Sequence, residues 1–263
     1  MLNRRDSRKI FEELIGVFDE KKSSEKSPGR LAIEIGRFFL GTPYVAGTLD
    51  VKKPEQLIVN LREFDCVTFV ETVVALTWLI GSGKRSFESF EKLLRKVRYR
   101  QGRLQGYSSR LHYFSDWIHD NQKKGIVRNV TKEIGGRPLK KAITFMTTNP
   151  DLYLSLRDEK NLRGMKSVER SMNRRSLCYI PKEGLRPRED QIRDGDLVAV
   201  TTHAESLDVK HVGFATRVNH RIRLLHASAK EGKVILSRQT LYRYLIQNKV
   251  HSGIIVTRIQ AKP

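Results

Sequence analysis

Apolar residues fill nearly every position between residues 67 and 80, a run that carries one charge and ends at the glycines of residues 81–83. A helix that is apolar on every side is buried in a core rather than lying on its surface. Asp65 is a favourable N-cap residue, so the pattern predicts a helix with Cys66 in its first turn.

The remaining pattern divides the chain into a helical first third and a β-rich last third. Amphipathic spacing predicts helices over residues 8–20, 31–40 and 87–97. Apolar runs bounded by turn residues predict strands, which we expect at residues 197–202, 211–216, 221–227 and 254–259. The second and third of these strands are joined by a short turn, as in a hairpin. Helices followed by an antiparallel sheet are typical of the α+β class.

The pattern is weaker in the middle of the chain, between residues 99 and 190. It indicates a strand-like piece at residues 142–145 and a basic helical segment at residues 152–175. We interpret this middle region as an insertion that elaborates a binding face.

The chain is strongly basic, with 50 Lys and Arg against 29 Asp and Glu and a net charge of +21. Such a charge attracts polyanions such as nucleic acid, anionic lipid headgroups or an acidic glycopolymer. The basic residues are dispersed, however, and no zinc-finger, RRM or KH pattern accompanies them. Nucleic acid is therefore not the expected partner. A non-catalytic protein that binds nucleic acid or the cell envelope stays as an alternative.

Two cysteines, Cys66 and Cys178, are too few for a disulfide framework and give no CxxC metal pair, so both are expected to be reduced. Cys178 is interpreted as a strand-filling residue. His112 and His119 are seven residues apart and have no evident third ligand. We interpret His220 and His251 as surface residues, and we expect neither a metal nor a cofactor.

The sequence shows no secretory signal after its basic N-terminus and no membrane-spanning segment. The protein is expected in the cytoplasm, or in the cell envelope or periplasm if a signal has been removed. The oligomeric state is not predicted.

Cys66 is the first candidate for catalysis, because the start of a helix favours a thiolate over a thiol. A nucleophilic cysteine needs a base and a third group that orients the base. His211 opens one predicted strand and His226 closes its hairpin partner, so both rings are expected at one end of the sheet. The competing interpretation is that Cys66 packs as a small apolar residue, as most free cysteines do.

The blocks around these residues resemble a known family. They are residues 41–50 (GTPYVAGTLD), 60–71 (NLREFDCVTFVE), 194–197 (DGDL), 211–213 (HVG) and 226–228 (HAS). Together they resemble the NlpC/P60 cysteine peptidase superfamily, whose papain-like members cut peptidoglycan. The first two blocks are similar to its DUF1460 branch of N-acetylmuramoyl-L-alanine amidase-like proteins. The resemblance spans residues 41–228.

The resemblance implies a papain-like α+β core in which a buried Cys-bearing helix packs on an antiparallel sheet, with a helical, basic insertion. One catalytic domain would span residues 1–263, with a helical part at about 8–40 and the insertion at about 99–190. The implied catalytic triad is Cys66, His211 and His226, with Tyr44 beside the thiol.

The implied activity is hydrolysis of the bond between muramic acid and L-alanine, through a thioester, in peptidoglycan or muropeptides. The backbone N–H of Cys66 and the Tyr44 hydroxyl would stabilise the oxyanion. Asp65 is either a helix cap or a substrate-binding residue, and the first role is favoured. The alternative activity is that of an endopeptidase that cuts within the stem peptide.

Overall fold

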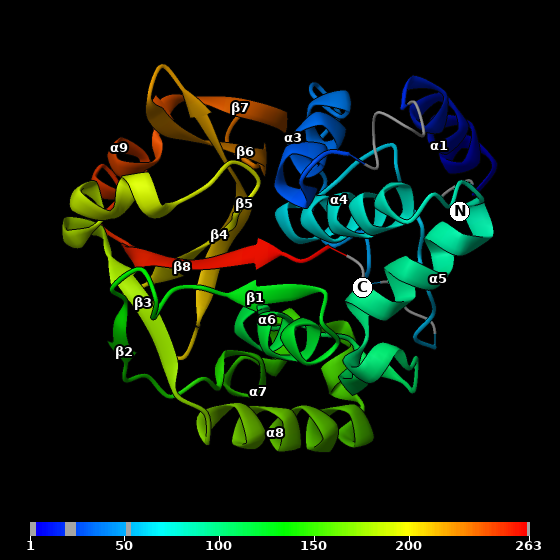
Figure 1. The fold of residues 1–263 in the computed structure, drawn as a ribbon. Coiled ribbons are helices and arrows are strands. Elements are labelled where there is room, and N and C mark those ends of the chain that lie inside the picture. Colours follow the sequence, from blue (N-terminus) through cyan, green and yellow to red (C-terminus); the bar gives the residue numbers. More distant parts are fainter. Residues whose placement is uncertain (1–3, 19–24, 51–53, 262–263) are drawn as a thin grey trace.

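The computed structural model describes residues 4–18, 25–50 and 54–261 (Figure 1). Its longer helices are α1 (Arg4–Val17), α3 (Pro28–Phe38), α4 (Cys66–Gly81), α5 (Phe87–Arg98), α6 (Phe114–Lys123) and α8 (Glu159–Asn173). Two short helices are α7 (Phe145–Thr148) and α9 (Leu241–Ile246). Short 3-10 turns lie at Arg100–Gly102, Tyr107–Ser109, Pro150–Leu152, Leu154–Arg157, Lys182–Gly184 and Arg186–Gln191. No helix within the described ranges is long and apolar enough to cross a membrane.

One antiparallel sheet contains the strands. They are β1 (Val127–Asn129), β2 (Arg137–Leu139), β3 (Leu177–Pro181), β4 (Leu197–Thr202), β5 (Val209–Val218), β6 (Arg221–Ser228), β7 (Lys233–Thr240) and β8 (His251–Ile259). Their order is β2-β3-β8-β4-β5-β6-β7, and β1 also pairs with β8. β4 lies along one side of β8, while β3 and β1 pair with different parts of its other side. The combination of helices and an antiparallel sheet agrees with the predicted α+β class.

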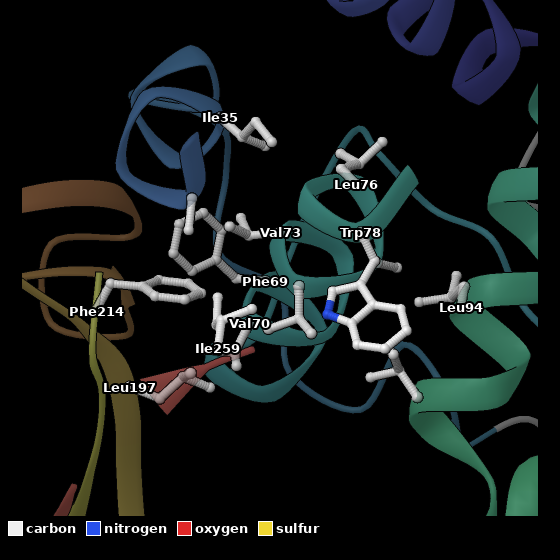
Figure 2. Close-up of a cluster of buried hydrophobic side chains, with 14 of the residues drawn as sticks. Ile35, Phe69, Val70, Val73, Leu76, Trp78, Leu94, Leu197, Phe214 and Ile259 are labelled. Carbon is white, nitrogen blue, oxygen red and sulfur yellow. The ribbon is translucent and has the colours of Figure 1, made fainter. Parts of the chain in front are cut away.

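The predicted central helix is α4, and it lies against the sheet beside α3 and α5 (Figure 1). Every residue from 68 to 80 is buried. Figure 2 shows Phe69 of α4 facing Phe214 of β5, Val70 beside Ile259 of β8, and Trp78 facing Leu94 of α5. Burying a large apolar side chain contributes roughly 1.5–3 kcal/mol, so α4 is a main source of the stability of this core.

In a second apolar cluster, part of the sheet packs against α9, and this cluster includes no residue of α4. Leu241 and Leu245 of α9 are fully buried there, together with Ala215 of β5 and Leu224 of β6. The strands β5 and β6 therefore contribute side chains to two cores, and this double burial fixes the register of the hairpin.

The region predicted as an insertion, residues 99–190, contributes β1 and β3 to the sheet and also contains α6 and α8. The helix expected over 152–175 begins later, at Glu159, because residues 150–157 form 3-10 turns. Tyr107, Tyr113, Met146, Met165 and Met172 form a third core cluster between these elements.

The strand expected at residues 142–145 was wrong. Residues 141–144 form no regular element and Phe145 begins the short helix α7. The side-chain amide of Asn173 bonds both backbone groups of Ile143, and the N–H groups of Thr144 and Phe145 donate to Ser206 O. These long-range partners take the backbone bonds that a strand ladder would have used.

Candidate active site

The cysteine lies where the sequence predicts, as the first residue of α4. Asp65 is the N-cap residue, and its Oδ1 accepts a hydrogen bond of 2.7 Å from the Thr68 backbone N–H. The Asp65 N–H donates in return to Thr68 Oγ1, at 2.9 Å. This capping box satisfies two backbone donors and fixes the direction in which the chain enters the helix. It thereby holds Cys66 in the first turn.

The two histidines lie on the β5–β6 hairpin. Its turn residues Asn219 and His220 both have positive φ, as a two-residue hairpin turn requires. The register pairs Phe214 with Leu225, so Gly213 lies beside His226. A Cβ on Gly213 would lie 2.8 Å from His226 Cβ and 2.9 Å from Leu225 O. The glycine therefore leaves the space that His226 occupies.

The imidazole rings of His211 and His226 are in direct contact. His211 Nε2 and His226 Nδ1 are 2.6 Å apart, with the rings nearly perpendicular at 82°. His211 is half-buried, and His226 is 3% exposed. One proton is shared along this contact, so each ring fixes the tautomer of the other.

Cys66 and His211 line the same cleft, which has a volume of about 230 Å³. The backbone amide of Val212, next to His211, hydrogen-bonds the Cys66 sulfur. This contact connects β5 to the start of α4, so the thiol and the His211 ring lie on one side of the molecule. Asp65 also lines the cleft.

Tyr44 lies close to the thiol but does not line this cleft in the described part of the chain. Its half-buried ring packs against the same core cluster as Cys66. Burial raises the pKa of Tyr44 to about 12, and the negative charges of Cys66 and Asp65 add to this rise. The phenol is therefore protonated at neutral pH and is available as a hydrogen-bond donor.

The ionisation of the site differs from the sequence expectation. Burial raises the pKa of the Cys66 thiol to about 12, and the Asp65 carboxylate adds to this rise. Backbone hydrogen bonds from Val212, Cys66 and Val67 oppose this shift without cancelling it. Burial also lowers the pKa of His211 to about 3 and that of His226 to about 4. At neutral pH the site holds a thiol and two neutral imidazoles, so the expected thiolate was wrong.

The far wall of the cleft carries charged side chains that the sequence did not single out. Arg110 is 8% exposed, donates to Asp50 Oδ1 at 2.8 Å and lies 3.3 Å from Glu55 Oε1. Asp208 is 1% exposed and accepts the Ser115 N–H at the start of α6. Arg110 and Asp208 are far apart in sequence and lie outside the blocks that carry the resemblance, so only the fold brings them together, whereas Asp50 ends the first of those blocks.

The other histidines follow the sequence expectations only in part. His112 precedes α6 and His119 lies within it, so the two do not share a helix face. His220 is exposed as expected, but His251 is 4% exposed at the start of β8, so its surface assignment was wrong. Within the described residues, no group of three or more His, Cys, Asp or Glu side chains is arranged to hold a metal ion.

An α+β fold in which a cysteine at a helix start and a histidine line one cleft, with a second histidine in contact with the first, is an arrangement suited to hydrolysis. Residues 34–254 match the family model described as AmiA-like, N-acetylmuramoyl-L-alanine amidase-like. The match covers most of the chain, and the protein therefore belongs to this family. Membership of the wider NlpC/P60 superfamily and a papain-like core stay predictions.

Several solved structures are similar to this chain. An N-acetylmuramoyl-L-alanine amidase from Bacteroides uniformis ATCC 8492 is 37% identical, with a TM-score of 0.84 over 89% of this chain and 99% of that chain. A Bacteroides fragilis protein, named as a suspected xylanase, is 38% identical, with a TM-score of 0.79 over 85% and 98%. A DUF1460 protein from Legionella pneumophila shares the fold at 22% identity, with a TM-score of 0.70 over 100% and 97%. No curated protein matches the chain.

Proposed function

We propose that this protein is a thiol amidase that hydrolyses the bond between N-acetylmuramic acid and L-alanine in peptidoglycan or its fragments. The family and the 37% identical amidase support the reaction class. The observation that carries the proposal is the 2.6 Å contact between His211 and His226, at a cleft that Cys66 shares with His211.

The proposed first step is attack of the Cys66 sulfur on the amide carbonyl. Because His211 Nε2 is engaged with His226, Nδ1 is the nitrogen left to accept the thiol proton. The sulfur–carbon bond forms as this proton moves, since the thiol and the imidazole both start neutral. The Cys66 N–H and the Tyr44 hydroxyl are the proposed donors to the oxyanion.

In the second step, protonated His211 gives its proton to the amide nitrogen of L-alanine, and the carbon–nitrogen bond breaks. The stem peptide leaves with a free amine, and the muramoyl group stays on sulfur as a thioester. His211 then takes a proton from water as the water oxygen attacks the thioester carbonyl. The carbon–sulfur bond breaks, His211 returns this proton to the Cys66 sulfur, and the muramoyl carboxylic acid is released and loses its proton to the solvent.

His226 is proposed to stabilise the charged intermediate rather than to transfer protons itself. When His211 gains the thiol proton, its Nε2–H donates to the lone pair of His226 Nδ1. This donation requires His226 to carry its own proton on Nε2. Asp65 is proposed to act as the helix cap, because its carboxylate is already engaged by Thr68.

Mass spectrometry of muropeptides digested with the protein tests the scissile bond. The amidase releases an intact stem peptide that begins with L-alanine, together with a muramic acid that has a free carboxylate. Cleavage between two amino acids would instead identify a stem-peptide endopeptidase and refute the proposed bond.

The proposed nucleophile is tested by Cys66→Ala, with Cys178→Ala as the matched control. Cys66→Ala is expected to abolish turnover and to keep the fold, because a small truncation at a helix start costs on the order of 1–2 kcal/mol. Cys178 lies in β3, outside the residues that line the cleft, and its variant is expected to keep turnover. Full activity of Cys66→Ala would rule out the thioester.

A further inference from the structure

A cluster of aromatic rings lies behind the proposed histidine pair. The ring of Tyr244, in α9, lies 6.2 Å from His211 and 5.9 Å from His226. His251, at the start of β8, stacks on Tyr244 at 5.2 Å with an angle of 28° between the rings. Four rings from β5, β6, α9 and β8 therefore form one contiguous group, at the end of the sheet that α9 covers (Figure 1).

The ring nitrogen of His226 that does not contact His211 has no hydrogen-bonding partner among the described residues. His226 Nε2 is buried and makes no hydrogen bond with any part of the chain that the structure describes. The same holds for His251 Nδ1, while the His251 ring hydrogen-bonds the Tyr244 backbone. No carboxylate or amide therefore fixes the His226 tautomer from behind. The position of the His226 ring therefore depends on ring packing and on the exclusion of water.

We infer that Tyr244 is a positioning residue, whose ring holds the His211–His226 pair in its reactive geometry and keeps water from His226. The inference rests on the proposed function, in which His211 takes the thiol proton. His251 supports Tyr244 from the other side. The phenol ring matters through its size and shape, so its hydroxyl is not needed for this role.

The charged and titratable groups around the histidine pair determine how removal of the Tyr244 ring would change the pKa values of His211 and His226. Cys66 faces the pair from α4, and His251 and Tyr244 face it from β8 and α9. The positive charges of Lys182 and Lys210 lower the pKa of His251. Burial is the largest cause of the lowered pKa of both His211 and His226. Water admitted in place of the ring would hydrate the imidazolium form and raise both pKa values.

The test compares Tyr244→Ala with Tyr242→Ala, a change of the same size on the same helix. Tyr242 is also half-buried, but it packs under the Arg186 guanidinium, 4.8 Å from its ring, instead of against the histidines. Tyr244→Ala is expected to lower kcat roughly 10- to 100-fold with little change in KM, as loss of orientation does. Its acid limb of kcat/KM is expected to move to higher pH. Tyr244→Phe keeps the ring and is expected to show neither effect.

An NMR titration of the histidine ring signals tests the inference without a turnover assay. His211 and His226 are expected to gain protons at least one pH unit higher in Tyr244→Ala than in the parent protein, and not in Tyr242→Ala. If Tyr244→Ala does not fold, Tyr244→Leu is expected to show a smaller shift of the same sign. Equal effects of the two Tyr→Ala variants, or unchanged titration in Tyr244→Ala, would overturn the inference. Absence of turnover in the parent protein would instead refute the proposed function.

Discussion

The Cys66 thiol is subject to two opposing influences at the start of α4. Backbone N–H groups favour the thiolate, whereas burial and the Asp65 carboxylate favour the thiol. Burial is the largest of these effects, so the pKa rises to about 12. A helix start alone therefore does not make a cysteine reactive, because its cap residue and its desolvation also decide the protonation state.

Replacing Asp65 by Asn tests this balance. Asn is as good an N-cap residue as Asp, so α4 is expected to keep its start. Loss of the carboxylate charge lowers the pKa of Cys66, and alkylation at fixed pH rises about tenfold for each pKa unit. The measurement is the iodoacetamide rate of Cys66 between pH 6 and 10, in a Cys178→Ala background.

The matched control for this variant is Asp50→Asn, which removes the same charge from the same cleft. Asp50 pairs with Arg110 and is not among the groups that shift the Cys66 pKa. Its variant is expected to alkylate at the parent rate. A parent rate that is flat between pH 6 and 8 would show a thiolate already formed, and would contradict the assignment of a neutral thiol and a neutral imidazole.

Gly213 is predicted to be required for the histidine contact. In Gly213→Ala, the new Cβ would lie 2.8 Å from His226 Cβ, so β6 or the ring must shift. Overpacking of this kind costs about 1–3 kcal/mol, and turnover is expected to fall with it. Denaturant unfolding and a turnover assay measure the two effects. Gly16→Ala is the control, because nothing lies within 4 Å of a Cβ there, and unchanged turnover in Gly213→Ala would contradict the prediction.

At the scale of elements, a buried ion pair joins α4 to α5 at the cleft, which Glu71 lines. Arg98 Nε donates to Glu71 Oε2 at 2.6 Å, and the two side chains are 3% and 2% exposed. Arg98 also donates to the Ile58 carbonyl, which ties the segment before α4 to the same pair. Burial raises the pKa of Glu71, and Arg98 opposes that shift.

Breaking this pair on one side is expected to cost far more than breaking a surface pair. Arg98→Met leaves the Glu71 carboxyl buried without its partner, which costs about 3–5 kcal/mol. Arg4 and Glu91 form a pair of similar length, 2.7 Å, but Arg4 is 64% exposed, so Arg4→Ala is expected to change the free energy of unfolding much less than Arg98→Met does. Urea unfolding measures both. The double variant Glu71→Leu with Arg98→Met is expected to recover most of the loss, and no recovery would contradict this explanation.

The elements that the sequence predicts well are those whose pattern is local. The apolar run of α4, its Asp65 cap and the alternation of β5 and β6 each specify an element without distant partners. His251 was misassigned because nothing near it in sequence indicates that Tyr244 covers its ring. Residues 142–145 were misassigned because Asn173 and Ser206 bind their backbone from far along the chain. The cleft wall around Arg110 was not predicted for the same reason.

At the scale of the whole molecule, the net charge of +21 coexists with buried carboxylates, several of which are paired with arginines. Asp116 accepts bonds from both Arg100 and Arg175, and Asp196 accepts two from Arg258. These buried carboxylates thus stabilise the fold, while the excess positive charge lies among the exposed Lys and Arg side chains. This distribution agrees with the dispersed charge of the sequence.

Buried histidines make the stability of the molecule depend on pH. The pKa values of His112, His211, His226 and His251 are all lowered, with burial as the largest cause. A histidine with a lowered pKa in the folded state is protonated first in the unfolded chain as pH falls below about 6.5. Its contribution to stability is therefore complete above that pH and is lost as pH falls toward the folded pKa, which is about 4 for His226 and about 3 for His211.

We expect the free energy of unfolding to fall between pH 6.5 and 4.5, by up to about 1.4 kcal/mol per pH unit for each such histidine. Buried carboxyls with a raised pKa, such as Asp208, act in the opposite direction at lower pH, so the test compares variants. His112 lies outside the histidine pair. The variant His112→Gln is expected to make the slope of the free energy of unfolding against pH shallower. His220→Gln, at an exposed turn, is the control and is expected to leave the slope as in the parent protein. Equal slopes in all three proteins, measured by urea unfolding, would show that burial of His112 does not contribute to acid sensitivity.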